Sequence, residues 1–436
     1  MTVDWEYFIS ESGKRWEPSA IRGLFPLEKL PGMVSLLAGK PNAETFPFSA
    51  ITVSLKPIVP GDAPEQLVVE SDALTEGLQY GPTAGLSGLI KWLENLQEMK
   101  HSRKKDGSWK VSVGSGSQDL INKAFCSLVN PGDSILLETP VYPGTLGLLK
   151  QHDVNLIEIP VDDAGLRPDL LEDTLANWST KHPNKRFPKL LYTIPTGSNP
   201  TGCSSPLERR KKILALVRQY NLLLLEDDAY HYLSFDPSNT TPTYFELEAT
   251  EGDGETGRVV RFDSFSKILS SGMRLGFLTA AKPLVDIVDL NTSNTNLQPS
   301  STTQAIVLVL LNKWGLDGFL AHTRRVAAFY KSKRDMFEKV AHKHLDGLAT
   351  WVTPDSGMFL FLNLNLTKDG SPGDSSELIS TTAVKKGVLA VPGIGFLPNG
   401  GQSSHVRVSF SLATEEDAEL AFQRLRDCIL EARGEL

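Results

Sequence analysis

Between about residues 80 and 325, short apolar runs alternate with longer segments whose apolar residues recur at helical spacing. The short runs, such as LLLLED, are almost continuously apolar rather than alternating with polar residues. Strands with that pattern are buried on both faces, which is typical of a parallel sheet covered by helices. We therefore predict an α/β domain with a mostly parallel seven-stranded sheet. The predicted strands are residues 111–113, 134–138, 154–161, 189–195, 222–227, 259–264 and 274–280.

The remaining segments predict a smaller lobe. Residues 1–60 are rich in proline and contain one short helical candidate, from about Ser19 to Leu30. A long helix, roughly from Leu316 to His344, is followed by two further strand-like runs and a terminal amphipathic helix. We predict that 61–325 form the large domain, and that 1–60 and 326–436 contribute to a small α/β lobe.

One predicted helix of the large domain is preceded by residues typical of a helix N-terminus. In SSPLERRKKILALVRQY, Ser205 is expected to cap the helix, and Pro206 suits its first turn. Glu208 follows three residues after Ser205, so we predict a capping box at this helix start.

The charge balance and the cysteines narrow the class of protein. The chain has 44 basic and 52 acidic side chains, a net charge of −8, which argues against nucleic acid or an anionic membrane as partner. Three widely spaced cysteines, Cys126, Cys203 and Cys428, fit a reducing compartment and suggest neither a disulfide framework nor a metal site. The first residues lack signal-peptide features, and no apolar run approaches the roughly 20 residues of a spanning helix. We expect a cytoplasmic protein.

Polar side chains follow five of the predicted strands. In sheets of this kind, ligands bind beyond the carboxyl ends of the strands, so these side chains are expected to meet at one edge. The five segments are GSGSQ (114–118), TPVY (139–142), TGSNP (196–200), DDAY (227–230) and DSFSK (263–267).

The pairing of a lysine with a carboxylate at that edge suggests pyridoxal phosphate. A lysine amine can hold this aldehyde cofactor covalently, and we expect Lys267 to do so. A carboxylate, expected to be Asp227, would keep the ring nitrogen protonated so that the ring acts as an electron sink. Asp227 ends the most apolar strand, where an unpaired carboxylate would be costly. Tyr230 and Asn199 would donate hydrogen bonds to the phenolic oxygen of the ring.

The cofactor phosphate needs donors, and two segments supply them. Ser117 and Gln118 lie where a helix is expected to begin, and free backbone N–H groups at such an end attract an anion. Ser264, Ser266 and Arg274 surround Lys267 and would complete the phosphate site. Tyr142 is expected to stack on the ring. Each segment alone would read as an ordinary loop, turn or surface charge, and it is their ordered occurrence that favours a site.

The order of these motifs resembles a known family. The chain is similar to the fold-type I, class I/II pyridoxal-phosphate aminotransferases, and within them to the kynurenine/2-aminoadipate and fungal aromatic amino acid aminotransferase branch. The resemblance covers nearly the whole chain, from about Arg22 to the terminal helix. It rests on YGPTAGLSGL, SGSQ, ETPVYPGT, PTGSNPTG, EDDAY, DSFSKILSSGMRLGF and VRVSFS.

The resemblance implies further roles. Lys267 matches the lysine that also carries a proton between substrate and cofactor, and Arg407 matches the arginine that binds the substrate α-carboxylate. Tyr80 matches a tyrosine that reaches the phosphate of a partner subunit, which implies a homodimer with shared active sites. Gly39 and Arg22 match the N-terminal substrate segment. Lys40 departs from this pattern, because relatives of the branch tend to be apolar there.

The implied reaction is a ping-pong transamination. An aromatic amino acid, or else kynurenine or 2-aminoadipate, would give its amino group to a 2-oxo acid, with 2-oxoglutarate expected as acceptor. Two alternatives stay open at this stage. A lyase or decarboxylase would use the same cofactor ligands. A non-catalytic effector-binding domain would need a DNA-binding domain, and the roughly 20 residues before Arg22 are too few for one.

Overall fold

The computed structural model describes residues 3–37, 39–58, 61–252, 254–368 and 373–436. The chain divides into two compact units, each built from two stretches of sequence. Unit 1 comprises Met1–Asn130 and Glu255–Ala321, and unit 2 comprises Pro131–Gly254 and His322–Leu436. The predicted domain boundaries after residues 60 and 325 stay a prediction.

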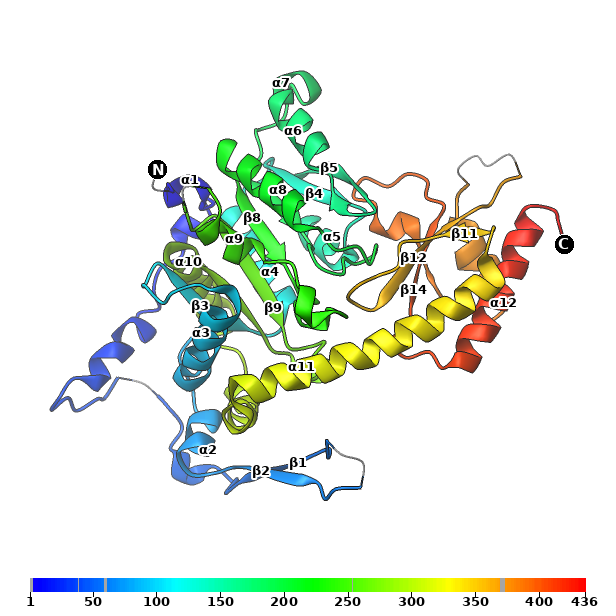
Figure 1. Ribbon diagram of the computed structural model, residues 1–436. Coiled ribbons are helices and arrows are strands. Elements are labelled where there is room, and N and C mark those ends of the chain that lie inside the picture. The colour runs from blue at the N-terminus through cyan, green and yellow to red at the C-terminus, as the bar shows by residue number, and fades with distance from the viewer. Residues whose placement is uncertain (1–2, 38, 59–60, 253, 369–372) are drawn as a thin grey trace. The chain divides into compact units, whose positions relative to one another are not determined.

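The core of unit 1 contains three strands in which the middle one runs opposite to its neighbours. Strand β10 (Gly276–Ala281) pairs antiparallel with β3 (Trp109–Gly114) and with β9 (Val259–Ser264) (Figure 1). Helices α4 (Ser117–Leu128) and α10 (Lys282–Thr295) pack on these strands. All three strands are buried because apolar side chains cover both of their faces. Unit 1 also contains α1 (Trp5–Phe8), α2 (Ser71–Leu78), α3 (Ser87–His101) and the first part of α11 (Ser301–Leu345).

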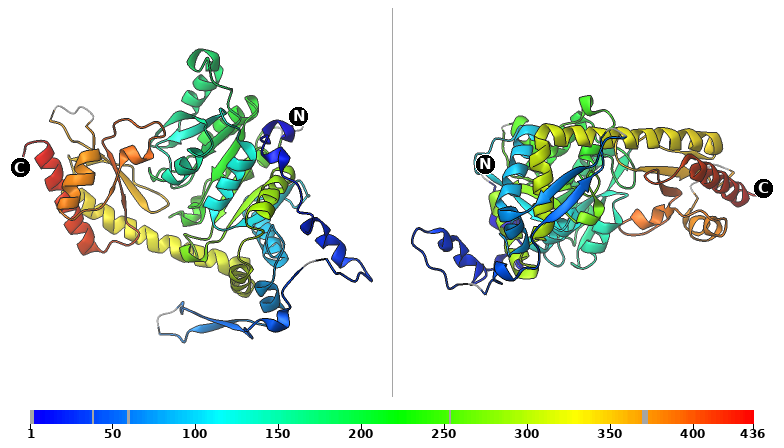
Figure 2. Two further views of the ribbon diagram at one scale, coloured as in Figure 1. Left: turned by 180° about the vertical axis from the view of Figure 1, so that it is seen from behind. Right: turned by 90° about the horizontal axis from the view of Figure 1, so that it is seen from below.

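The N-terminal part of unit 1 is extended. The predicted helix near Ser19–Leu30 is present as a 3₁₀ helix, η2 (Arg22–Lys29), and short 3₁₀ turns lie before and after it. Strands β1 (Ile51–Leu55) and β2 (Glu65–Val69) form an antiparallel ribbon that extends away from α2 (Figure 2). Large apolar side chains lie exposed in this part, among them Val34 and Leu36.

Unit 2 contains the parallel part of the predicted sheet. Strand β4 pairs with β5 and β7, and β7 pairs with β8, all in parallel, while the two-residue β6 turns back antiparallel to β5. The seven predicted strands are all present, and the α/β fold class is confirmed. The elements are β4 (Ser134–Thr139), α5 (Pro143–Leu149), β5 (Asn155–Asp162), β6 (Gly165–Leu166), α6 (Pro168–Ala176), α7 (Trp178–Lys181), β7 (Leu190–Thr193), α8 (Leu207–Gln219), β8 (Leu223–Asp227) and α9 (Tyr244–Thr250).

A second, antiparallel sheet of unit 2 has the strand order β11-β12-β14-β13. Helix α12 (Glu415–Ala432) and the second half of α11 (Ser301–Leu345) supply buried apolar side chains that pack with those of β12 and β14 (Figure 1). This packing joins the two helices to the small sheet, and the grouping of residues 326–436 into a separate C-terminal lobe stays a prediction. Its strands and remaining helical turns are β11 (Ala349–Thr350), β12 (Phe359–Leu364), η7 (Leu378–Ala383), β13 (Val391–Pro392), η8 (Gly393–Phe396) and β14 (His405–Ser409).

Helix α11 is interrupted at Gly315, whose φ of 63° and ψ of −177° are not helical. The segment after this break begins where the long helix was predicted. Within the described ranges, α11 is also the one helix long and apolar enough to span a membrane, by length and composition alone. A helix in a protein core passes the same test, and Val307, Leu311 and Phe319 of α11 are fully buried.

The predicted capping box at Ser205 is wrong. Helix α8 begins at Leu207 with Pro206 at its N-cap, and no side chain caps it. Ser205 is held in the preceding loop, because its N–H donates to Pro195 O and its carbonyl accepts from Arg210 Nε. A capping box does occur at α12, between Thr414 and Asp417.

Candidate active site

The predicted site residues fall into two groups, one in each unit. Those of unit 2, which we call the ring-side cluster, are Tyr142, Asn199, Asp227, Tyr230 and Arg407. Asp227 is the last residue of β8 and is buried. Its Oδ2 accepts a hydrogen bond of 2.6 Å from the hydroxyl of Tyr192 on the neighbouring strand β7. Burial and the Asp227 carboxylate raise the pKa of Tyr192 well above its usual value, so this phenol stays a donor.

Tyr230, Asn199 and Arg407 lie together. Arg407 Nη1 donates to Asn199 Oδ1 at 2.8 Å, and a hydrogen bond links Asn199 to Tyr230. Burial, followed by the Asp227 carboxylate, raises the pKa of Tyr230 far above its usual value. Tyr230 is therefore a neutral hydrogen-bonding phenol across the physiological pH range. These contacts join the ends of β7 and β8 to strand β14.

The Arg407 side chain is packed between aromatic rings. Its guanidinium carbon lies 4.3 Å from the ring centre of Phe359 and 5.1 Å from that of Phe396. Both contacts are of the cation–π kind, and they fix the plane of the guanidinium. Burial lowers the pKa of Arg407 from its usual value, but an arginine remains charged at neutral pH. Arg407 is therefore an oriented cation suited to a planar carboxylate.

Tyr142 precedes helix α5, and its ring occupies the space beside Gly144. A Cβ at Gly144 would lie 2.3 Å from Tyr142 Cε1, so only glycine fits beneath this ring. The backbone before Tyr142 is tied to the C-terminal lobe, because Val141 N donates to Phe396 O at 2.9 Å. Tyr142 thus lies just after the end of β4, and its stacking role stays a prediction.

Glu138 is a buried carboxylate that was not among the predicted site residues. It is the second-last residue of strand β4 and accepts from Thr193 Oγ1 at 2.7 Å, Ile194 N at 3.0 Å and Ser198 Oγ at 3.1 Å. All three donors belong to the segment that leads into Asn199. Burial raises the pKa of Glu138 to about 7, although the three hydrogen bonds oppose that shift. Glu138 therefore anchors the segment that carries Asn199.

We expect the stability of the protein to depend on the protonation of Glu138. Its pKa rises on folding from 4.5 to about 7, so the folded state binds this proton more tightly. Stability from this group is complete below about pH 4.5 and is lost as the pH rises through about 7, by up to about 3 kcal/mol. The Glu138→Gln variant cannot ionise at this position and should lack that loss. Its urea midpoint, relative to the midpoint of the wild type, should therefore be higher at pH 8 than at pH 5.5.

The Glu138→Ala variant separates charge from hydrogen bonding. It removes the acceptor from three buried donors, at about 1–3 kcal/mol each, and should be less stable than Glu138→Gln at both pH values. If the urea midpoints of the wild type and Glu138→Gln changed equally with pH, the raised pKa of Glu138 would not be the source of the pH dependence.

The second group, in unit 1, is the phosphate-side group of Ser117, Gln118, Ser264, Ser266, Lys267 and Arg274. Arg274 Nη2 donates to Ser115 O at 3.2 Å, and its Nη1 lies 3.5 Å from Ser266 Oγ. Ser266 N in turn donates to Ser264 Oγ at 3.2 Å. These contacts bring the turn after β9 next to the start of helix α4.

Gly116 allows this close approach. A Cβ there would lie 2.6 Å from Arg274 Nη2, and its φ of 89° favours glycine. The group thus combines a guanidinium, two serine hydroxyls and the N-terminal end of the 12-residue helix α4. Each of these donors suits a phosphate, so the residues present fit the phosphate end of the predicted cofactor.

The other predicted residues of unit 1 are placed as follows. Lys267 is partly buried in the turn after β9, and Tyr80 is 51% exposed just after α2. Gly39 lies in exposed coil, and Arg22 is the first residue of η2. Lys40 forms an ion pair with Glu28 at 3.0 Å. Because Lys267 and Asp227 belong to different units, their predicted placement on either side of one pyridine ring stays a prediction.

The class of this protein follows from its fold, these two groups and its relatives. The family model for aminotransferase class I and II matches residues 64–425, and the chain belongs to this family. It is thus an aminotransferase, and its cofactor is pyridoxal phosphate.

Among its relatives, the chain is 48% identical to aminotransferase tdiD of Emericella nidulans, over 96% of this chain and 94% of that protein. It is 37% identical to the mitochondrial kynurenine/alpha-aminoadipate aminotransferase of Bos taurus, over 99% and 100% of the two chains. These names support the aminotransferase prediction rather than the lyase alternative.

Solved structures of aminotransferases have a similar fold. Aminotransferase Aro8 from Candida albicans has a TM-score of 0.88 at 25% identity, covering 100% of this chain and 99% of that one. The alpha-aminoadipate aminotransferase LysN from Thermus thermophilus, complexed with N-(5'-phosphopyridoxyl)-L-leucine, has a TM-score of 0.69 at 28% identity, covering 82% and 84%.

Tyr192 provides a prediction for cofactor binding. Its hydroxyl is the donor to Asp227 Oδ2, and a hydrogen bond to a charged group contributes about 1.5–3 kcal/mol. The Tyr192→Phe variant keeps the ring that packs in the core, and it should bind pyridoxal phosphate about tenfold to a hundredfold more weakly. Titration of the apoenzyme, followed by cofactor absorbance, measures this loss. The matched control is Tyr220→Phe, which makes the same substitution at a tyrosine that does not bond to Asp227. It should bind pyridoxal phosphate as the wild type does.

Proposed function

We propose that this aminotransferase transfers the amino group of an aromatic amino acid to 2-oxoglutarate by a ping-pong mechanism, with kynurenine and 2-aminoadipate as further donors. The observation that carries the proposal is the arrangement of Arg407, which is half-buried, lies against the rings of Phe359 and Phe396 and donates to Asn199. An oriented guanidinium binds the α-carboxylate that all of these substrates share. The relatives named for kynurenine, alpha-aminoadipate and aromatic amino acids support the choice of donors.

The remaining residues take the following roles in the proposal. When bound, pyridoxal phosphate supplies a ring that accepts the electron pair left when the substrate loses its α-proton. Asp227, which accepts a hydrogen bond from Tyr192, would keep the ring nitrogen protonated through its negative charge. Tyr230 and Asn199 would donate hydrogen bonds to the phenolic oxygen, and Tyr142 would stack on the ring.

Lys267 holds the cofactor when no substrate is present, and its amine moves the substrate proton from the α-carbon. The phosphate-side group of Ser117, Gln118, Ser264, Ser266 and Arg274 binds the phosphate. Arg274, Ser266 and Ser264 are already linked by hydrogen bonds, so these three need little rearrangement on binding.

A homodimer completes the proposal. The exposed ring of Tyr80 would reach the phosphate in a partner subunit, and the exposed apolar side chains of the N-terminal segment, among them Val34 and Leu36, would be covered there. Gly39 and Arg22 would border the substrate. A cytoplasmic location fits the three free cysteines, two of which are buried.

The test is a panel of half-reactions. Purified holoenzyme is mixed with phenylalanine, tyrosine, tryptophan, kynurenine or 2-aminoadipate, and the change in cofactor absorbance is followed. Glutamate formed on adding 2-oxoglutarate measures the second half. The proposal predicts the highest kcat/KM for an aromatic donor. Conversion with aspartate or alanine alone would contradict the donor class, and pyruvate as the only acceptor would contradict 2-oxoglutarate.

A further inference from the structure

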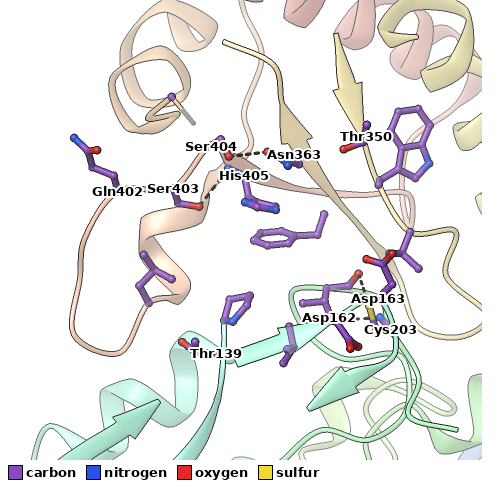
Figure 3. Close-up of a pocket in the computed structure, with 18 residues that line it drawn as sticks. Thr139, Asp162, Asp163, Cys203, Thr350, Asn363, Gln402, Ser403, Ser404 and His405 are labelled. Atoms are coloured by element: carbon purple, nitrogen blue, oxygen red, sulfur yellow. Dashed lines mark hydrogen bonds between the residues drawn. The ribbon is translucent and has the colours of Figure 1, made fainter. Parts of the chain in front are cut away.

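Unit 2 contains a cavity whose lining includes no residue of the ring-side cluster. It has a volume of about 520 Å³ and lies between the ends of β4 and β5 and the strands of the small sheet (Figure 3). Thr139 and Asp163 face it from one side, and Asn363 and His405 from the other. That volume suits a ligand of small-molecule size.

Aromatic rings form one wall of this cavity. The rings of Phe361 and His405 stack with their centres 4.7 Å apart and their planes 19° from parallel. Burial lowers the pKa of His405, so its ring is neutral at physiological pH. Trp351 contributes a third ring to the lining. Rings of this kind offer π-faces to a flat or cationic ligand.

The charged side chains of the lining all have one sign. Asp162 and Asp163 line the cavity, and no lysine or arginine does so among the described residues. Both oxygens of Asp162 are occupied by Arg209. Asp163 lies in the exposed turn between β5 and β6 and has no hydrogen bond or ion pair within the described part of the chain. The cavity therefore has one carboxylate available for a ligand.

These features exclude the substrates of transamination as occupants. Amino acids and 2-oxo acids carry a carboxylate, for which this lining has no cation and to which Asp163 presents a like charge. The Arg407 guanidinium, on the same strand as His405, lies against Phe359 and Phe396 and does not line the cavity.

We propose that this cavity is a binding site for a small organic cation with a flat ring, the ring lying against Phe361 and His405 and the cationic group near Asp163. The aromatic wall accounts for the ring, and the single available carboxylate accounts for the charge. The site is additional to the amino-transfer site and does not depend on which amino donor the enzyme prefers.

The test uses benzyltrimethylammonium, because a quaternary ammonium cannot react with an aldehyde cofactor. Its binding to the holoenzyme is measured by isothermal titration calorimetry, with phenylacetate and benzyl alcohol as the anionic and neutral ring controls. We expect saturable binding of the cation with no change in cofactor absorbance. Asp163→Asn should weaken binding about tenfold, and Phe361→Leu about fivefold.

The matched control is Asp62→Asn, which removes an exposed carboxylate in unit 1 and should bind the cation as the wild type does. Asp163 is exposed in a turn, so its replacement does not threaten the fold. Equal affinity of wild type and Asp163→Asn, tighter binding of phenylacetate than of the cation, or an accompanying shift of the cofactor spectrum would each overturn the proposal.

Discussion

Replacing Lys267 with alanine is expected to lower kcat for transamination by at least about 10³-fold. Lys267 is the proposed proton carrier and the proposed covalent attachment point, so its loss removes both functions. The side chain is only partly buried, in the turn after β9, and its truncation should leave the fold intact. Steady-state kinetics with an aromatic donor and 2-oxoglutarate measures the loss.

A second readout tests the attachment directly. Borohydride reduction of the wild-type holoenzyme, followed by proteolysis and mass spectrometry, should place the cofactor on the peptide that contains Lys267. The Lys91→Ala variant, which removes an exposed lysine of α3 in the same unit, should keep wild-type activity. A Lys267→Ala enzyme with normal turnover, or a cofactor label on another lysine, would remove Lys267 from its proposed role.

The seven strands of the large sheet were predictable because consecutive apolar residues in the sequence indicate a strand that is buried on both faces. Runs of consecutive apolar residues, such as the four leucines at 222–225, are typical of strands that are covered on both faces of a sheet. Strand β6 was missed because its two residues pair with β5 alone, across a tight turn. The capping box at Ser205 failed because a backbone bond to Pro195 and the side chain of Arg210 hold that residue in the loop. Those partners cannot be read from the helix sequence itself.

Candidate site residues could be proposed from the sequence where polar residues follow strands, but not where they lie inside apolar runs. Tyr192 and Glu138 each sit within a predicted strand, and they look like exceptions to its apolar pattern. Their partners are distant in sequence, since Tyr192 bonds to Asp227 at a separation of 35 residues and Glu138 to Thr193 at 55. A buried polar residue requires a partner, so these two exceptions were a usable signal. The identity of the partner needed the fold.

Replacing Arg407 is expected to have the second-largest effect on activity. The substrate carboxylate loses its contacts with water when it binds, and the guanidinium of Arg407 is proposed to replace them. Removing one partner of a buried, hydrogen-bonded charge pair costs about 2–5 kcal/mol. The Arg407→Met variant should therefore lower kcat/KM for amino donors by about 10²- to 10³-fold, mainly through a higher KM. The same loss should appear for 2-oxoglutarate, since the proposal has both substrates use this arginine in turn.

The Arg407→Lys variant distinguishes geometry from charge. Lysine keeps the positive charge but cannot donate two parallel hydrogen bonds or lie flat between Phe359 and Phe396. The kcat/KM of Arg407→Lys should therefore be about tenfold higher than that of Arg407→Met, and still below that of the wild type. The Arg433→Lys variant, changed near the chain end, serves as the matched control and should behave as wild type. If Arg407→Lys had a wild-type KM for every donor, the carboxylate would not be bound by an oriented guanidinium, and the packing of Arg407 would be structural.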